Sequence, residues 1–372
     1  MALRTLFALS AALLASLTLT GSAVIAAGPP SAQDVWATTL EAAKKEGTVV
    51  CGCAIHPGSR AFLMSRWQQD YPDIKLDYTP ATLPDWPARV EAERAAGQYR
   101  WDVFFTGPGP EVYRLAHEGI FDPLLPALIQ PDIKNPKTWG GWDNAFYDDE
   151  KKYMMSFWTS LLSPYYNAKF VSPDRVKKLG LRILLEPEFK GKIVFWDPRV
   201  GGSGSNMAQF LYMKLGADGL KKILVDQEAV FLNDSNAMAD RMVRGAAYFA
   251  LGPRLDENLV QYKKAGLQID IRAMGNTPAF AGLSTEYGIL SIFNRPAHPN
   301  AAKVFVNWLL SKPVQEGLDA AVNIKSRRTD VAPPSSDTDW AVSGANYTAL
   351  QQEKFLAPRQ KIMQYARDLR PQ

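Results

Sequence analysis

Apolar runs of strand length alternate with amphipathic segments through the first third of the chain. "AQDVWATTLEAAKKEG" (residues 32–47) has apolar positions at helical spacing and ends in glycine, whereas "TVVCGCAI" (48–55) is a continuous apolar run. The alternation continues through "PGSRAFLMSRWQQDYP", "IKLDYTPA", "WPARVEAERAAG", "WDVFFTG" and "PEVYRLAHEG". This pattern predicts a mostly parallel sheet with helices on both of its faces.

A second unit of the same kind occupies the later part of the chain. Its predicted strands and helices are "KIVFWDP", "SNMAQFLYMKLG", "EAVFLND", "NAMADRMVRG", "AAYFALG", "LDENLVQYKKAG" and "QIDIRAM". Extended segments at 153–167 and 278–293 link the two units, and a last helix is expected at 346–369. Because 372 residues exceed the size of a single hydrophobic core, we predict an α/β protein of two lobes. Residues 32–158 and 290–372 are assigned to lobe I, and residues 159–289 to lobe II.

The N-terminus has the features of a secretory signal. Arg4 precedes an apolar run at 6–19 and small residues at 21–27, which predicts a signal peptide over residues 1–26 and a periplasmic mature protein. Loss of Arg4 lowers the formal net charge from +4 to +3. So small a bias, without a run of basic residues, does not favour a nucleic-acid partner.

The two cysteines, Cys51 and Cys53, lie one residue apart in a predicted strand. Alternation along a strand points both side chains to the same face. A bridge between such close neighbours would be strained, so we expect free thiols, with an intermolecular or adventitious disulfide as the less favoured alternative.

Several stretches follow one another in a familiar order. They are "GTVVCGCAIHPGSR", "WDVFFTGPG", "SPYYNAKFV", "GKIVFWDPRVGGSGSNMAQFLY", "FLNDSNAMADRMVRGAAYFALG" and "AHPNAAKVFVNWLLSKPVQEGL". Together they resemble the extracellular solute-binding proteins of ABC importers, with the type II periplasmic binding fold, in the branch of ferric, thiamine, phosphonate and sugar-phosphate binders. The resemblance implies two lobes with two hinge crossovers that close on a small-molecule solute and deliver it to an ABC permease in the inner membrane. We accordingly expect a monomer with no cofactor, no metal and no enzymatic activity.

Small polar residues stand at three predicted helix starts, where parallel strands end. The residues concerned are Ser59, then Ser203, Gly204, Ser205 and Asn206, and finally Ser235 and Asn236. Helix N-termini offer unpaired N–H groups and the positive end of a dipole, so the pattern favours a small organic anion such as a phosphonate, a phosphate ester or a carboxylate. The simpler reading is that these residues are good helix caps.

Further candidates flank these helix starts. Arg60 and Arg199 could each clamp an oxyanion through the planar guanidinium, or form surface ion pairs instead. Trp158 could wall the solute or pack the hinge. His56 and Thr106 lie on loops that the resemblance places at the ligand.

Two alternative functions remain open. In ferric binders of this family adjacent tyrosines in lobe II hold the metal, but the matching stretch here has only Tyr248, followed by phenylalanine. Of the pair in "LLSPYYNAKF", Tyr165 is the candidate for solute contact and Tyr166 is expected to be scaffold. The second alternative is a thiaminase-like enzyme with Cys53 as nucleophile near His56.

Overall fold

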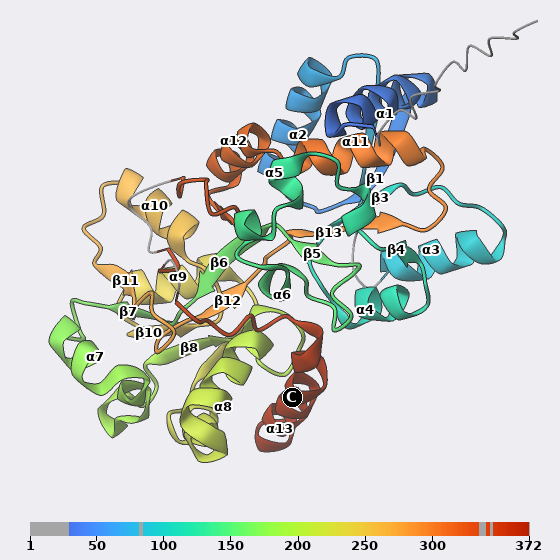
Figure 1. Cartoon of the computed structure of the whole chain (residues 1–372). Coiled ribbons are helices and arrows are strands. Elements are labelled where there is room, and N and C mark those ends of the chain that lie inside the picture. Colours follow the sequence, from blue (N-terminus) through green and yellow to red (C-terminus); the bar gives the residue numbers. More distant parts are fainter. Residues whose placement is uncertain (1–29, 82–84, 335–339, 343–344, 372) are drawn as a thin grey trace, which may run out of the picture.

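The computed structural model describes residues 30–371 except 82–84, 335–339 and 343–344. The chain forms two lobes that lie above and below a small central sheet (Figure 1). The expected signal peptide lies outside the described residues.

Lobe I contains a six-stranded sheet between two layers of helices. One core lies under α1, α2, α11 and α12, and the other lies under α3 and α4. The helices of this lobe are α1 (Ala32–Glu46), α2 (Pro57–Asp70), α3 (Asp85–Ala95), α4 (Pro110–His117), α5 (Pro131–Lys134), α6 (Trp142–Ala145), α11 (Pro299–Leu309) and α12 (Lys312–Val322). Its strands are β1 (Thr48–Cys53), β2 (Lys75–Pro80), β3 (Val103–Thr106), β4 (Phe121–Asp122), β5 (Met155–Ser156) and β13 (Ile289–Phe293).

Lobe II contains a five-stranded sheet with the order β11-β7-β10-β8-β9. Its strands are β7 (Tyr165–Asn167), β8 (Ile193–Trp196), β9 (Val230–Leu232), β10 (Phe249–Leu251) and β11 (Ile271–Ala273). Its helices are α7 (Pro173–Leu179), α8 (Ser203–Lys221, broken at Gly216), α9 (Ser235–Val243), α10 (Asp256–Lys264) and α13 (Leu356–Leu369). One core lies against α7, α8 and α13, and the other against α9 and α10.

The predicted α/β fold with two lobes is confirmed, but both sheets are mixed rather than mostly parallel. In lobe I, β1, β2 and β3 run parallel, whereas β13 runs antiparallel to β3. In lobe II, β8, β9 and β10 run parallel, whereas β7 runs antiparallel to β10. The antiparallel strand, β13 in lobe I and β7 in lobe II, comes directly after a crossover segment, so the chain enters each sheet from the hinge side.

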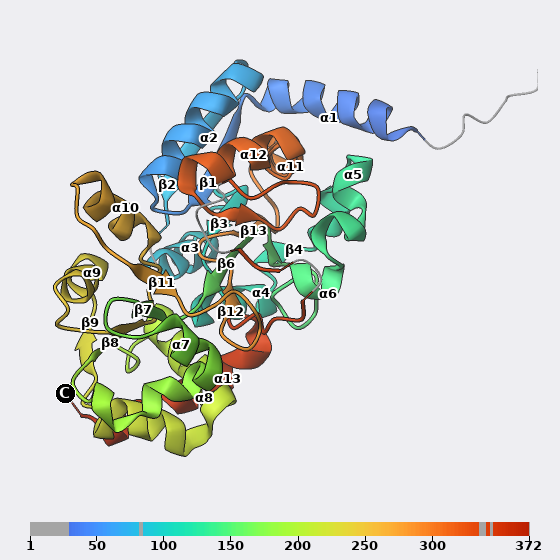
Figure 2. The ribbon, with the colours of Figure 1, turned by 90° about the vertical axis from the view of Figure 1, so that its left-hand side faces the viewer.

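Three strands form the hinge sheet between the lobes, β12-β6-β14. The two extended segments expected at the crossovers supply β6 (Trp158–Leu162) and β12 (Gly282–Ser284), which pair antiparallel, and β14 (Lys325–Ser326) follows α12. The C-terminal segment makes a third passage between the lobes, which the pattern of the sequence does not predict. Its last helix, α13, begins at Leu356 rather than 346 and lies along α8 in lobe II (Figure 2), so the assignment of 290–372 to lobe I does not describe it.

The expectation of free thiols was wrong, because Cys51 and Cys53 form a disulfide. Their Cα atoms are 5.3 Å apart, within the usual span of a disulfide, and both side chains are fully buried in the first core. The shared face of the strand, which we had noted, is what allows the two sulfurs to meet.

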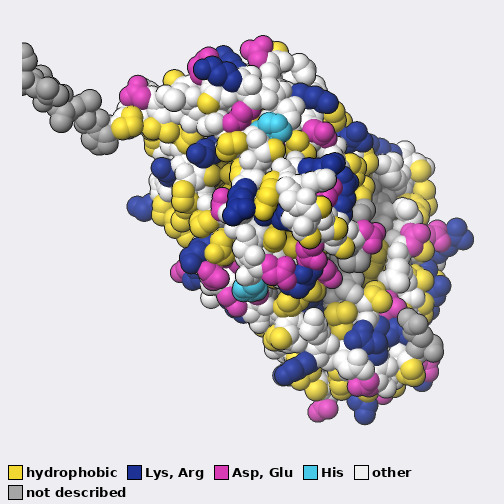
Figure 3. Space-filling model, turned by 90° about the vertical axis from the view of Figure 1, so that its right-hand side faces the viewer, with side chains coloured by type: hydrophobic (Ala, Val, Ile, Leu, Met, Phe, Trp, Pro, Cys, Tyr) yellow, Lys and Arg dark blue, Asp and Glu magenta, His cyan; other side chains and the backbone are white. Residues whose placement is uncertain are grey.

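The surface gives two further facts about this chain. On the face in Figure 3, Lys and Arg side chains are interspersed with Asp and Glu, so that face offers no continuous basic track for a phosphate backbone. Of the helices in the described ranges, none has the length and apolar character that crossing a bilayer requires.

Candidate functional site

A cavity of about 420 Å³ lies between the lobes, at the ends of strands from both sheets. Its lining residues are Ile55, Ala81, Thr106, Gly107, Pro108, Leu162, Gly202, Ser203, Asn206, Ser284, Glu286, Tyr287 and Gln351. These come from the loops after β1, β2 and β3, from the hinge, from the start of α8 and from the C-terminal segment. Because both lobes contribute walls, a solute held here would touch both at once.

The lobe II wall is the N-terminus of α8. Gly202 takes φ 119 just before the helix, and Ser203 is the first helical residue. Gly204 lies so close to the end of β8 that a Cβ there would be 2.2 Å from the carbonyl oxygen of Trp196. The Ser205 hydroxyl donates to Gly202 O at 2.9 Å. The glycines thus bring the free N–H groups of the first turn to the cavity.

Asn206 is held in one orientation at this wall. Its side chain is 5% exposed, lines the cavity and accepts a 2.8 Å hydrogen bond at Oδ1 from Nη1 of Arg359, a residue of α13. Since a guanidinium only donates, the amide atom that faces Arg359 is the oxygen. The Nδ2 amide group is therefore the part of Asn206 left for another partner.

The lobe I wall includes Thr106 and borders on His56. Thr106 ends β3 and is 5% exposed. His56 is the N-cap of α2, with Nδ1 accepting a 3.2 Å hydrogen bond from Ser59 N, and its ring centroid is 6.3 Å from that of Tyr287. The sequence had pointed to Ser59 as the cap; instead Ser59 lies in the first turn and is fully buried. Pro57 at the first helical position fixes this start.

A charged group lies where the hinge meets the cavity. Glu286 has φ 49, and its carboxylate accepts a 2.5 Å hydrogen bond from the Ser160 hydroxyl. Arg254, after β10, forms a 3.3 Å ion pair with Asp256. Burial lowers the pKa of Arg254, but Glu286 and Asp256 more than offset this and hold it above its ordinary value. Burial and the charge of Glu286 raise the pKa of Tyr287, so its phenol stays a neutral donor.

Of the thirteen predicted site residues, Thr106, Ser203 and Asn206 line this cavity, and His56, Gly204 and Ser205 adjoin it. The others lie elsewhere. Trp158 is fully buried, and its Nε1 donates to Asp319, so it packs the hinge rather than walling a solute. Arg199 is tied to Asp197 and to the Arg370 carbonyl instead of facing the cavity.

Four more predicted residues also lie outside the lining. Arg60 is exposed, with its guanidinium 5.8 Å from the ring of Tyr78. Tyr165 is 6% exposed in a core of lobe II. Ser235 and Asn236 open α9, but Asp234 caps it by accepting from two backbone N–H groups. A role in solute contact for these residues stays a prediction.

Five residues at or near the cavity were not predicted from the sequence. They are Glu286, Tyr287, Gln351, Arg254 and Arg359. Their positions depend on the hinge and on the C-terminal passage, which join segments far apart in the chain. A signal was present only for Arg254, which comes two residues after the predicted strand "AAYFALG".

The family follows from a match that includes most of the residues lining the cavity. The model for bacterial extracellular solute-binding proteins matches residues 56–316, more than half of the chain. The chain belongs to this family. Members bind small solutes and are generally not enzymes, and membership indicates a periplasmic or extracellular protein.

One relative and two solved structures illustrate what this chain is similar to. An uncharacterized protein of Haemophilus influenzae is 25% identical over 259 residues, covering 66% of this chain and 67% of that one. Iron-bound HitA from Pseudomonas aeruginosa has a TM-score of 0.61 at 16% identity, covering 87% of this chain and 99% of that one. AfuA from Actinobacillus pleuropneumoniae, with exogenous fructose-6-phosphate bound, has a TM-score of 0.55 at 19% identity, with coverages of 87% and 98%. At these identities the solved structures establish the shared two-lobe fold.

The structure also shows the surroundings of the tyrosines considered for iron binding and of Cys53, the nucleophile of the thiaminase-like alternative. Tyr248 stacks on Phe170 at 4.5 Å, and burial followed by the charge of Asp256 raises the pKa of Tyr165 well above 10. Within the described ranges, no group of three or more His, Cys, Asp or Glu residues could hold a metal ion. Cys53 is buried in its disulfide, so in this state it presents no thiolate to the cavity.

Proposed function

We propose that this protein is the periplasmic receptor of an ABC importer and that its solute is a small organic anion held in the interlobe cavity. A phosphonate, a phosphate ester or a carboxylate would fit this chemistry. In this proposal the signal peptide is cleaved near residue 26, and the mature protein acts as a monomer that delivers the solute to an inner-membrane permease.

The observation that carries the anion proposal is the start of α8. Ser203 and Asn206 line the cavity at the N-terminus of a long helix, and the amide of Asn206 is turned so that its Nδ2 donor has no hydrogen-bond partner among the described residues. Free backbone N–H groups, a hydroxyl and an amide N–H₂ form a set of donors, which suits an oxyanion. Thr106 and the phenol of Tyr287 add two hydroxyls from the opposite side.

The two-sided lining supports closure as the transport signal. A solute that contacts both walls binds the closed arrangement more tightly than the open one and shifts the population towards it. The permease would then recognise the closed form.

Ferric ion is the runner-up solute. His56, Glu286 and Tyr287 gather at one side of the cavity, and each can supply a metal ligand. The guanidinium of Arg254 beside Glu286 opposes cation binding there. HitA, which has iron bound, and AfuA, which has exogenous fructose-6-phosphate bound, share this fold, so both kinds of solute are kept in the test.

A thermal-shift panel tests the proposal. Methylphosphonate, fructose-6-phosphate, citrate, thiamine, spermidine and ferric chloride are each added to the purified mature chain. We expect one or more of the organic anions to raise the melting temperature, and Asn206→Ala to reduce that rise. Stabilisation by the organic cations alone would contradict it. A visible charge-transfer band with ferric chloride that is lost in Tyr287→Phe would favour iron instead.

A further inference from the structure

Arg359 is a buried guanidinium without an acidic partner among the described residues. It lies on α13 with 8% of its surface exposed, and its Nη1 donates to Asn206 Oδ1 at 2.8 Å and to the Leu350 carbonyl at 3.4 Å. Its titratable neighbour, Tyr113, has a pKa raised well above 10 by burial and is neutral. Burying a cation without a counter-charge costs desolvation free energy, which lowers the stability of the folded chain.

Two other buried or nearly buried arginines among the described residues have acidic partners. Arg328 is 1% exposed and forms ion pairs with Asp132 and Asp330, each at 2.9 Å. Arg199 pairs with Asp197 at 2.7 Å. Arg359 differs from these two because no carboxylate of the described residues pairs with it, and its side-chain partner, Asn206, lines the interlobe cavity.

Asn206 connects Arg359 to that cavity. The guanidinium fixes the amide oxygen on the α13 side, which leaves the N–H₂ group for the cavity. An anion bound at Asn206 would also lie within reach of the field of Arg359, since a partly buried charge is screened only weakly.

We propose that Arg359 is a positioning and specificity-determining residue for the solute. It orients the Asn206 donor, and its positive charge is balanced by the bound anion. This inference rests on the proposed function and deepens it, because it makes the C-terminal helix part of the binding site. Arg359 acts through Asn206 and does not itself line the cavity.

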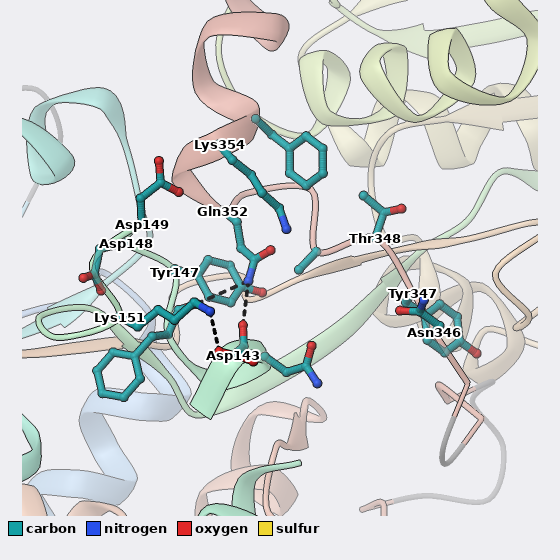
Figure 4. A pocket seen from close by; sticks show the side chains of 14 residues that line it. Asp143, Tyr147, Asp148, Asp149, Lys151, Asn346, Tyr347, Thr348, Gln352 and Lys354 are labelled. Carbon is teal, nitrogen blue, oxygen red and sulfur yellow. Dashed lines mark hydrogen bonds and ion pairs between the residues drawn. The ribbon is translucent and has the colours of Figure 1, made fainter. Parts of the chain in front are cut away.

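The passage that brings α13 to this place also contacts lobe I. Residues 349–355, which we call the strap, lie against the loop after α6 (Figure 4). Gln352 Nε2 donates to the carbonyls of Asp143 and Phe146, and Glu353 accepts from Asp149 N at 2.8 Å. Gln351, also in the strap, lines the cavity and accepts from Thr285 N at 2.8 Å. Arg359 is thus held by a segment that is fixed to both lobes.

Titration with inorganic phosphate by calorimetry tests the inference. Arg359→Lys keeps the charge and a donor, Arg359→Gln keeps only a donor, and Arg359→Met keeps neither. Lys361→Gln removes a charge from the exposed face of the same helix and is the matched control. We expect Kd for phosphate to rise about tenfold or more in the Gln and Met variants and to change less than about threefold in the Lys and control variants.

Two further measurements separate positioning from folding. Asn206→Ala combined with Arg359→Met should cost less than the product of the two single losses, because both changes disrupt one unit. The ratio of Kd in Arg359→Gln to Kd in the native chain should persist when salt is added, because a charge as buried as that of Arg359 is screened only weakly. If the variants melt at the same temperature as the native chain, the differences in Kd reflect binding and not a loss of folding.

Several outcomes would overturn the inference. They are no phosphate binding to the native chain at millimolar concentrations, unchanged Kd in the folded Gln and Met variants, or strictly independent effects of Arg359 and Asn206. If an anion from the panel stabilises the native chain and Arg359→Gln equally, the proposed function stands and the role of Arg359 fails. If no member of the panel stabilises the chain, the proposed function itself loses its support.

Discussion

Arg254 in lobe II donates a hydrogen bond from Nη2 to the carbonyl oxygen of Asn323 in lobe I, at 3.0 Å. Asn323 ends α12 in a left-handed conformation, φ 49, which turns its carbonyl out of the helix. The two residues come from different lobes, so the bond forms only when the lobes lie in this arrangement.

Replacing the Arg254 guanidinium by a shorter, uncharged side chain should favour the open arrangement. A hydrogen bond that involves a charged group contributes roughly 1.5–3 kcal/mol, so Arg254→Gln should lower the ratio of closed to open molecules about tenfold or more. Small-angle scattering would show a larger radius of gyration, and solute affinity should fall. Arg272→Gln, an exposed arginine of the same lobe paired with Asp270, serves as the control. Identical scattering from Arg254→Gln and the native chain would show that the bond does not hold the lobes.

Gly204 should not tolerate a side chain. A Cβ there would lie 2.2 Å from Trp196 O and 2.6 Å from Asp197 O, so Gly204→Ala must push α8 away from β8. Overpacking of this kind costs about 1–3 kcal/mol, and the cavity wall would shift with the helix. Urea unfolding should show this loss together with weaker solute binding.

Gly201→Ala is the matched control for this substitution. A Cβ at position 201 has no heavy atom within 4 Å, and its backbone does not require positive φ. We expect its free energy of unfolding to stay within about 0.5 kcal/mol of the native value. Equal effects of the two substitutions would mean that contact with β8 does not position α8.

The order of helices and strands was predictable from the sequence because it depends on local periodicity. Gly47 does end α1 in the left-handed conformation, and the two long extended segments do form the hinge strands. The caps were less predictable. Ser59 and Ser235 are good caps by type, but His56 and Asp234 take that role, since the choice among neighbouring polar residues depends on where the backbone leaves the strand.

The candidate site was predictable only in part. Asn206 was found because it stands at a helix start, a local signal. Arg359 lies 153 positions further along the chain, and nothing near it in the sequence indicates that α13 returns to lobe II. Glu286 was missed for a similar reason, since its partner Ser160 is on the other hinge segment.

The Cys51–Cys53 disulfide should stabilise the fold modestly. It closes a loop of three residues, for which the loss of chain entropy in the unfolded state corresponds to about 1–2 kcal/mol. Urea unfolding with and without a phosphine reductant should show this difference, provided that the fully buried bond is reduced after unfolding. The Cys51→Ala/Cys53→Ala chain should be insensitive to the reductant. An equal shift in that double variant would assign the effect to the reductant and not to the disulfide.

Asp319 should make stability depend on pH. It is 1% exposed, and it accepts hydrogen bonds from Trp158 Nε1 at 3.2 Å and from Ser326 N at 2.6 Å, which tie α12 to the hinge sheet. Burial raises its pKa to about 8, although both hydrogen bonds and the nearby Lys325 act in the opposite direction.

The direction of the pH effect follows from the protonation of Asp319 in the folded and in the unfolded chain. Between about pH 4 and 8 the folded chain binds a proton at Asp319 that the unfolded chain has released, so the contribution of this group falls as pH rises through that window. Asp319→Asn removes the titration, and its melting temperature should therefore decline less than that of the native chain from pH 5 to pH 8. Asp330→Asn is the control, because the Arg328 guanidinium lowers the pKa of Asp330 and places its titration below this window. Equal changes in melting temperature between pH 5 and pH 8 for the native chain and Asp319→Asn would show that Asp319 is already ionised in the folded hinge.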